Sequence, residues 1–168
     1  MQSLLYDFRK NANPADWQIV DDGVMGGRSQ GNFKIDDSGL GVFYGKVSTE
    51  NIGGFSSVRH EFAPLAVTKD STIRIRLKGD GKDYQFRIKD NVSTSHSYIG
   101  TFLTNGEWQN IEIILADLEP SFRGRKLAIP NFDKTSIQEI RFLIGNKRDE
   151  RFKLLLDKIE LQCYFLLF

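Results

Sequence analysis

Two strictly alternating segments, Thr72–Lys78 and Asp83–Lys89, constrain the fold of this chain more than any other feature. Every second residue in each of them is apolar, which is the period of a β-strand with one buried face. Six further segments have strand composition and are separated by clusters of Gly, Asn, Asp and Ser that favour turns: residues 40–47, 55–62, 98–103, 108–115, 137–144 and 152–161. We therefore predict an all-β fold, an antiparallel β-sandwich of about eight to ten strands with almost no helix.

Residues 79–82 join the two alternating segments and predict a β-hairpin. With Lys78 opposite Asp83, the apolar residues of both strands share one face, which we expect to lie in the core: Ile73, Ile75, Leu77, Tyr84, Phe86 and Ile88. This register places Arg74 opposite Arg87, and like charges directly opposed cost stability. Either an acid on a third strand, with Glu112 and Glu139 as candidates, or an anionic partner would relieve that cost, so Arg74 and Arg87 are candidate binding residues.

Length and charge limit the classes of protein to which this chain can belong. Its 168 residues fit one domain, which we expect over residues 1–162, followed by an apolar tail at 163–168. The 23 Lys and Arg nearly balance the 22 Asp and Glu, so the formal charge of +1 does not predict nucleic-acid binding. No apolar run reaches the ~18 residues of a membrane-spanning helix. Cys163 is the only cysteine, which excludes an internal disulfide.

The first residues of the sequence lack the features of a signal or transit peptide. We therefore expect a cytoplasmic protein, with the mitochondrial matrix as the location only if a transit segment precedes this sequence.

Two segments, residues 17–31 and 45–59, each contain a Gly-Gly step beside acids and amides. We expect these glycine segments to approach each other and to build one binding surface for a partner or ligand. The candidate residues are Asp22, Met25, Gly26, Gly27, Arg28, Ser29, Glu50, Asn51, Gly53, Gly54 and Arg59. Their backbone N–H groups can form an anion-binding nest, and the alternative is that the glycines only make tight turns. Arg59 is expected to pair with Glu50 or Asp22 and so to lock the two segments together.

Catalytic chemistry is not predicted. His60 and His96 are the only histidines, and neither stands near a serine or cysteine motif typical of a nucleophile. No dinucleotide-binding or P-loop motif is present, and we predict no cofactor. A calcium site built from Asp21, Asp22 and Glu50 is an alternative to the use of these acids as turn formers and caps. The basic segment 119–127 is either a rim loop or a solvated connection.

The two glycine segments resemble the complex I intermediate-associated protein 30 family in their residues and in the order in which the segments occur. The similar positions of the first segment are Trp17, Asp22, Met25, Gly26, Gly27 and Ser29, and those of the second are Val47, Ser48, Glu50, Asn51, Gly53, Gly54, Phe55 and Arg59. Residues 140–144 and 152–161 look like the closing strands of that family. The resemblance implies a galactose-binding-like jelly roll and an assembly chaperone without catalysis, whose partner is a protein, with a respiratory-complex intermediate as the family's example.

The chain looks more like compact bacterial relatives than like the mitochondrial members, because it shows neither their transit segment nor their N-terminal extension. Two function classes follow. The first is a non-catalytic protein-interaction or assembly module. The second is a carbohydrate-binding module, suggested by the fold alone, in which Trp17, Tyr98 or Trp108 would serve as a sugar platform.

Overall fold

A computed structural model describes residues 2–163, without the side chains of Val24, Met25 and Ile52. The described residues form thirteen strands: β1 (Gln2–Asp7), β2 (Gln18–Asp21), β3 (Gln30–Ile35), β4 (Gly41–Val47), β5 (Ser56–Ala66), β6 (Thr72–Lys78), β7 (Asp83–Lys89), β8 (Ser97–Leu103), β9 (Trp108–Ile114), β10 (Glu119–Phe122), β11 (Arg125–Lys126), β12 (Ser136–Ile144) and β13 (Glu150–Gln162). Four short 3₁₀ helices accompany them: η1 (Pro14–Asp16), η2 (Asp22–Met25), η3 (Glu50–Ile52) and η4 (Leu115–Asp117). No helix in this part of the chain is long and apolar enough to cross a membrane.

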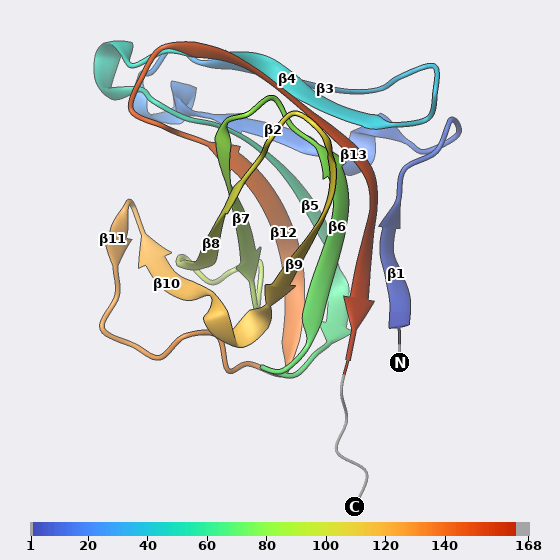
Figure 1. Cartoon of the computed structure of the whole chain (residues 1–168). Coiled ribbons are helices and arrows are strands. Elements are labelled where there is room, and N and C mark those ends of the chain that lie inside the picture. Colours follow the sequence, from blue (N-terminus) through green and yellow to red (C-terminus); the bar gives the residue numbers. More distant parts are fainter. Residues whose placement is uncertain (1, 164–168) are drawn as a thin grey trace, which may run out of the picture.

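The strands form two antiparallel sheets that pack face to face as a β-sandwich (Figure 1). The six-stranded sheet has the order β3-β4-β13-β6-β9, with β1 paired to β13, and the seven-stranded sheet has the order β11-β10-β8-β7-β12-β5-β2. The predicted all-β sandwich is confirmed. All eight expected segments form strands, but the described residues hold more strands than the eight to ten expected, because short β1, β2, β3, β10 and β11 were not predicted.

The predicted hairpin between Thr72–Lys78 and Asp83–Lys89 is wrong. Strand β6 pairs with β13 and β9 in one sheet, whereas β7 pairs with β12 and β8 in the other. The six apolar residues are nevertheless each at most 1% exposed, because they face one another across the interior from opposite sheets: Ile73, Ile75, Leu77, Tyr84, Phe86 and Ile88. Alternation determines which face of a strand is buried, but it does not determine which strand lies beside it.

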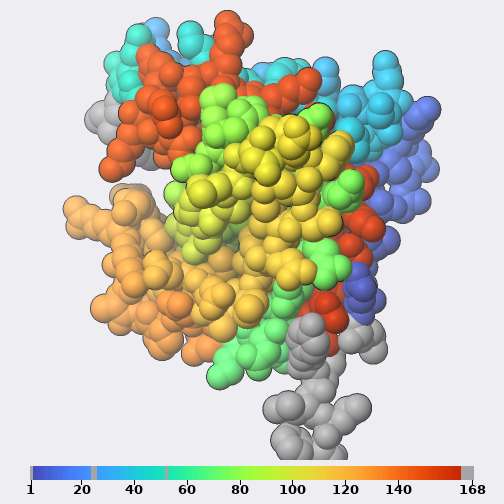
Figure 2. Space-filling model, in the orientation of Figure 1, coloured from blue at the N-terminus to red at the C-terminus, as the bar shows by residue number. Residues whose placement is uncertain are grey.

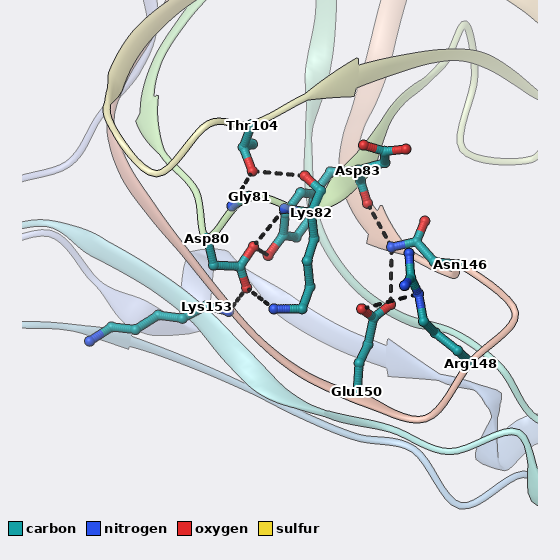
Figure 3. Close-up of polar contacts among 10 residues, drawn as sticks. Asp80, Gly81, Lys82, Asp83, Thr104, Asn146, Arg148, Glu150 and Lys153 are labelled. Atoms are coloured by element: carbon teal, nitrogen blue, oxygen red, sulfur yellow. Dashed lines mark hydrogen bonds and ion pairs between the residues drawn. The ribbon is translucent and has the colours of Figure 1, made fainter.

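The connection from β6 to β7 crosses between the sheets and is held by side-chain hydrogen bonds (Figure 3). Asp80 Oδ2 accepts a bond of 2.8 Å from the backbone N–H of Lys153 in β13. Thr104 Oγ1 accepts from the N–H of Gly81 at 3.0 Å and donates to the carbonyl of Lys82 at 2.7 Å. Thr104 follows β8 and Lys153 lies in β13, so both partners are remote in the sequence. Thr104 satisfies backbone groups of the connection, and Asp80 satisfies one of β13.

Trp17 lies in the core beside the first glycine segment and is only 4% exposed. Its ring contacts five others: Tyr6, Phe8, Phe33, His60 and Phe142. This aromatic cluster joins β1 and β3 of one sheet to β5 and β12 of the other, so it fixes the chain on either side of the glycine segment.

The last strand, β13, ends at Gln162, and the Cys163 side chain is 8% exposed beside the core. The rest of the expected apolar tail, residues 164–168, lies outside the described residues.

Candidate functional site

The two glycine segments meet at the buried carboxylate of Asp22, which has no exposed surface. Asp22 Oδ1 accepts a bond of 3.0 Å from the N–H of Ser29, and Oδ2 accepts one of 2.6 Å from the Ser29 hydroxyl. From the second segment, the N–H groups of Gly54 and Phe55 donate to Oδ2 at 2.7 and 3.3 Å. We call these four residues the Asp22 junction; it brings together segments more than thirty positions apart, as the sequence predicted.

Electrostatics of the Asp22 junction favour the carboxylate form. Burial opposes ionisation of Asp22, but the hydrogen bonds from Ser29, Gly54 and Phe55 outweigh it, so the pKa of Asp22 is lowered from its usual value. The predicted anion nest is therefore occupied by an anion of the protein itself. These backbone donors are not open to an external ligand.

Close approach to this carboxylate explains the first Gly-Gly step. A Cβ atom on Gly27 would lie 2.3 Å from Asp22 Cγ, so a larger residue cannot be accommodated without displacing the acid. Gly54 has open space around it but a φ of +137°, a backbone conformation that disfavours other residues. Both glycines therefore serve the junction, one by contact and one by conformation.

The acids proposed for calcium do not form one site. Asp21 accepts bonds from the Ser56 hydroxyl (2.5 Å) and the Gly31 N–H (2.7 Å), while Glu50 lies 3.7 Å from Arg28 in an exposed ion pair. Within residues 2–163 no group of three or more His, Cys, Asp or Glu side chains is arranged to hold a metal ion. Both carboxylate oxygens of Asp21 and of Asp22 already accept hydrogen bonds from the protein, so these two acids brace the glycine segments.

Other candidate residues of the two glycine segments lie near the Asp22 junction. Gly26 follows η2 with a φ of +87°. A Cβ atom there would be 3.9 Å from the carbonyl oxygen of Asn51, and Asn51 itself has a φ of 54°. Gly53 is equally constrained, since its Cβ would lie 2.7 Å from Asp22 Oδ2. The side chain of Met25 lies outside the described residues.

Arg59 pairs with neither Glu50 nor Asp22, which corrects our expectation, and its link to the first glycine segment is through Gln18. Its guanidinium instead donates two bonds of 3.3 Å to Gln18 Oε1, and it lies 3.3 Å from Glu61 and 3.8 Å from Glu139. The side chain of Arg59 points to the outer face of the seven-stranded sheet, whereas Asp22 is buried where the segments join. The partners of Arg59 therefore come from β2, β5 and β12.

A cleft of about 1110 Å³ opens on that outer face. One wall is the second glycine segment with Thr49, Gly53, Gly54 and Phe55. The floor is formed by β7 and β12, and the remaining walls come from the turn between β10 and β11 and from the chain after β12. The other lining residues are Gln85, Arg87, Arg123, Gly124, Arg141, Leu143, Gly145 and Lys147. Figure 2 shows the surface hollowed between the orange β10–β11 region and the red-orange chain that follows β12.

Three arginines stand side by side on β5, β12 and β7, and two of them, Arg141 and Arg87, lie in the floor of the cleft. Arg141 of β12 is opposite Arg59 of β5 and also opposite Arg87 of β7, and we call these residues the arginine row. Glu139, which is 1% exposed, lies 3.5 Å from Arg141. Arg87 donates two bonds to Gln85 Oε1 at 2.9 and 2.7 Å, and no carboxylate among the described residues lies within ion-pair distance of it.

Charge and burial perturb the arginine row. Burial, followed by the charge of Arg141, lowers the pKa of Arg87 to about 10, and Glu139 opposes this shift. Burial also lowers the pKa of Arg141, again against the effect of Glu139. Both guanidinium groups remain charged near neutral pH, so the floor of the cleft is a partly desolvated cationic surface.

Arg74 is not part of this site. It lies on the outer face of the six-stranded sheet and makes an ion pair of 2.6 Å with Glu112, which is opposite it on β9. The charge of Arg74 is therefore neutralised within the protein by one of the two acids expected from the sequence. Five lining residues were not predicted from the sequence: Gln85, Arg141, Leu143, Gly145 and Lys147. For Arg141, the signal was the alternation of 140–144, which points it away from the core like Arg87. The basic segment 119–127 does reach a rim, through Arg123 and Gly124.

Comparison with solved structures supports the fold. A family 11 carbohydrate-binding module of the cellulosomal cellulase Lic26A-Cel5E of Clostridium thermocellum superposes with a TM-score of 0.74 at 16% identity, covering 98% of this chain and 95% of that one. The same kind of module from Clostridium thermocellum, in complex with a β-1,3-1,4-mixed-linked tetrasaccharide, gives a TM-score of 0.72 at 16% identity and covers 96% and 95%. An exo-β-agarase gives 0.58 at 11% identity, over 97% of this chain and 26% of that one. These likenesses show a jelly-roll β-sandwich of the carbohydrate-binding-module type.

A search of curated protein sequences gave no match. A family model, however, matches residues 6–156 and thus includes the Asp22 junction, the arginine row and the whole cleft. The chain belongs to the complex I intermediate-associated protein 30 family.

Proposed function

We propose that this protein is a non-catalytic binding module that holds a segment of a partner protein in the cleft of its seven-stranded sheet, in the manner of an assembly factor. The observation that carries the proposal is the cleft itself, whose wall is the second glycine segment and whose floor is formed by β7 and β12. Membership of the family makes an assembly intermediate, such as one of a respiratory complex, the proposed class of partner. A single domain over residues 1–162 and a cytoplasmic location complete the proposal.

The surroundings of the two histidines favour binding over catalysis. His60 Nδ1 lies 2.9 Å from the carbonyl oxygen of Asp16, and its ring stacks on Trp17 at 5.2 Å. His96 Nε2 lies 3.3 Å from the hydroxyl of Tyr98. Neither histidine lines the cleft, and both are engaged in packing or hydrogen bonds between strands and loops. Their placement supports a structural role for each.

A carbohydrate partner is the alternative, favoured by the solved carbohydrate-binding modules that share the fold. The placement of the aromatic residues argues against it. Trp17 and Tyr98 are 4% and 1% exposed, and Trp108 lies on the other sheet under the guanidinium of Arg76. Phe55 is the one aromatic side chain among the described residues that line the cleft. Sugar sites commonly use aromatic platforms, so this lining suits a polypeptide better.

Site-specific photo-crosslinking tests the proposal. A benzophenone side chain replaces Phe55 in the cleft or, as the matched control, Trp108, which is an aromatic residue 37% exposed on the opposite sheet. We expect one identified protein, present in stoichiometric amount, to crosslink to the cleft position, and unlabelled wild-type protein to compete for it. Crosslinking of that protein at position 108 but not at 55 would remove the cleft from the proposal. Binding of a neutral oligosaccharide in a glycan array, without a protein adduct, would favour the alternative.

A further inference from the structure

The cleft carries four cationic side chains and no acid among its described lining residues. The cations are Arg87, Arg123, Arg141 and Lys147, which come from β7, the β10–β11 turn, β12 and the chain after β12. Because these cations surround the cleft from several elements, their positive potentials add inside the cleft. The protein as a whole has a formal charge of only +1, so this concentration of positive charge is local to the cleft.

The arginine row is incompletely neutralised by the protein. Glu139 serves Arg141 and Arg59 at once, while the guanidinium of Arg87 has only the neutral amide of Gln85 as a partner. Two buried atoms at this position, Arg141 Nε and Glu139 Oε2, lack a hydrogen-bond partner within the described part of the chain. Directly opposed like charges cost stability, and an external anion held by the exposed part of the guanidinium groups would offset that cost.

We propose that the cleft recognises carboxylate side chains of an extended partner segment, which Arg87 and Arg141 bind through their guanidinium groups. This inference rests on the proposed function and names the chemistry of the partner. Arginine matches a carboxylate with parallel N–H donors, and a partly desolvated guanidinium makes such a bond stronger. Apolar Phe55 and Leu143 lie in the same lining and provide contacts for the neighbouring residues of the segment.

The dimensions of the sheet give the length of the bound segment. Two walls of the cleft adjoin the start of β5 and the end of β10, and these strands lie four inter-strand steps apart in the order β5-β12-β7-β8-β10. At ~4.8 Å a step this span is about 19 Å, which corresponds to about six residues of extended chain at ~3.3 Å each. A mixed surface of cations and apolar side chains over that length suits a short acidic peptide strand.

The probe is a fluorescent peptide of about six residues in which Glu and Ser alternate, with Gln replacing Glu in its neutral counterpart. Binding to the whole protein is measured by fluorescence anisotropy at low ionic strength. We expect the acidic peptide to bind and the neutral one not to, and raising NaCl from about 0.05 M to about 0.5 M to weaken binding strongly. Arg87→Gln should weaken binding about tenfold or more, the usual effect of losing a charged hydrogen bond.

Arg74→Gln is the matched control, because it removes the same charge from the opposite sheet, where Glu112 already pairs with Arg74. It should leave affinity unchanged. Arg87→Gln should not lower the melting temperature, since it removes a charge opposed to Arg141. Arg141→Lys keeps a cation beside buried Glu139 and loses the fork, so it should also weaken binding while the protein stays folded.

Several outcomes would overturn the inference. These are equal binding of the acidic and neutral peptides, no binding of the acidic peptide, equal losses for Arg87→Gln and Arg74→Gln, and preferential binding of an acidic oligosaccharide such as oligogalacturonate. Crosslinking of a partner at Phe55 would still stand in the first three cases, so failure of this inference is distinguishable from failure of the proposed function.

Discussion

Replacing Asp22 by Asn removes one negative charge and changes almost nothing in size, so it isolates what the buried carboxylate contributes. Its Oδ2 accepts three hydrogen bonds, from the Ser29 hydroxyl and the N–H groups of Gly54 and Phe55, and Oδ1 accepts one from the Ser29 N–H. The amide oxygen of Asn can occupy only one of the two positions, Oδ1 or Oδ2. If it occupies the position of Oδ2, the NH₂ group occupies that of Oδ1 and cannot accept the hydrogen bond of the Ser29 N–H, because both groups are donors.

The size of the effect follows from these four bonds. One buried N–H left without an acceptor costs roughly 1–3 kcal/mol, and three bonds that lose their charged acceptor each weaken by about 0.5–1 kcal/mol. We therefore expect Asp22→Asn to lower the free energy of unfolding by about 3 kcal/mol near neutral pH. Asp22→Ala would leave three backbone donors unpaired and cost about 5 kcal/mol, which approaches the whole stability of many domains.

The assay is urea unfolding followed by tryptophan fluorescence, since Trp17 is buried beside the first glycine segment. Asp22 has a lowered pKa in the folded state, so its contribution is fully present above the unfolded pKa of about 3.9 and is lost as pH falls through the folded value. The difference between wild type and Asp22→Asn should accordingly persist down to about pH 4 and shrink below it.

Asp36→Asn is the control, because Asp36 also accepts two backbone bonds of 2.9 Å but only within its own exposed turn. It should cost about 1 kcal/mol. The reasoning fails if Asp22→Asn costs no more than Asp36→Asn, or if its cost does not change with pH in the acid range.

Four further substitutions test the glycines of the junction and the arginine row. Gly27→Ala should lower the free energy of unfolding by about 2–4 kcal/mol, because the new Cβ atom clashes with the buried carboxylate of Asp22. Gly54→Ala should lower it by about 1–3 kcal/mol through backbone strain at its positive φ. Thermal melts measure both, and unchanged melting temperatures would contradict the geometry. Arg59→Lys should leave amide exchange of Gly54 unchanged, whereas faster exchange there would show that Arg59 does hold the loops. Arg141→Gln should destabilise more than Arg141→Gln/Glu139→Gln, because the single change leaves a buried carboxylate poorly paired, and equal urea midpoints would refute this.

The sequence determines the layers of this fold better than its connections. Alternation in Thr72–Lys78 and Asp83–Lys89 correctly predicts every buried residue, because burial depends only on which face a side chain occupies. The pairing of these strands could not be predicted in the same way. A four-residue connection serves a hairpin and a crossing between sheets equally well, and the bonds that select the crossing come from Thr104 and Lys153, far along the chain.

The candidate site was predictable in part for the same reason. The glycine steps indicate a constrained backbone, and their meeting at Asp22 follows the prediction. The partner of Arg59 was not predictable, because Glu139 becomes its neighbour only through the pairing of β5 with β12. The sequence predicted that Arg87 lies opposite another arginine, Arg74. The residue opposite Arg87 is instead Arg141, and this pairing follows from the position of β12 beside β7.

The Asp22 junction and the cleft share the second glycine segment, and this links stability to binding. Gly54 and Phe55 donate their N–H groups to Asp22 and also line the cleft. Burying a carboxylate is costly, and an apolar junction would avoid that cost. A carboxylate, however, orients both donors at once and so holds this wall in one conformation before a partner arrives. Because a preformed wall spares a partner the entropy of ordering it, the acid inside the protein prepares the surface on which the arginines meet an acid from outside.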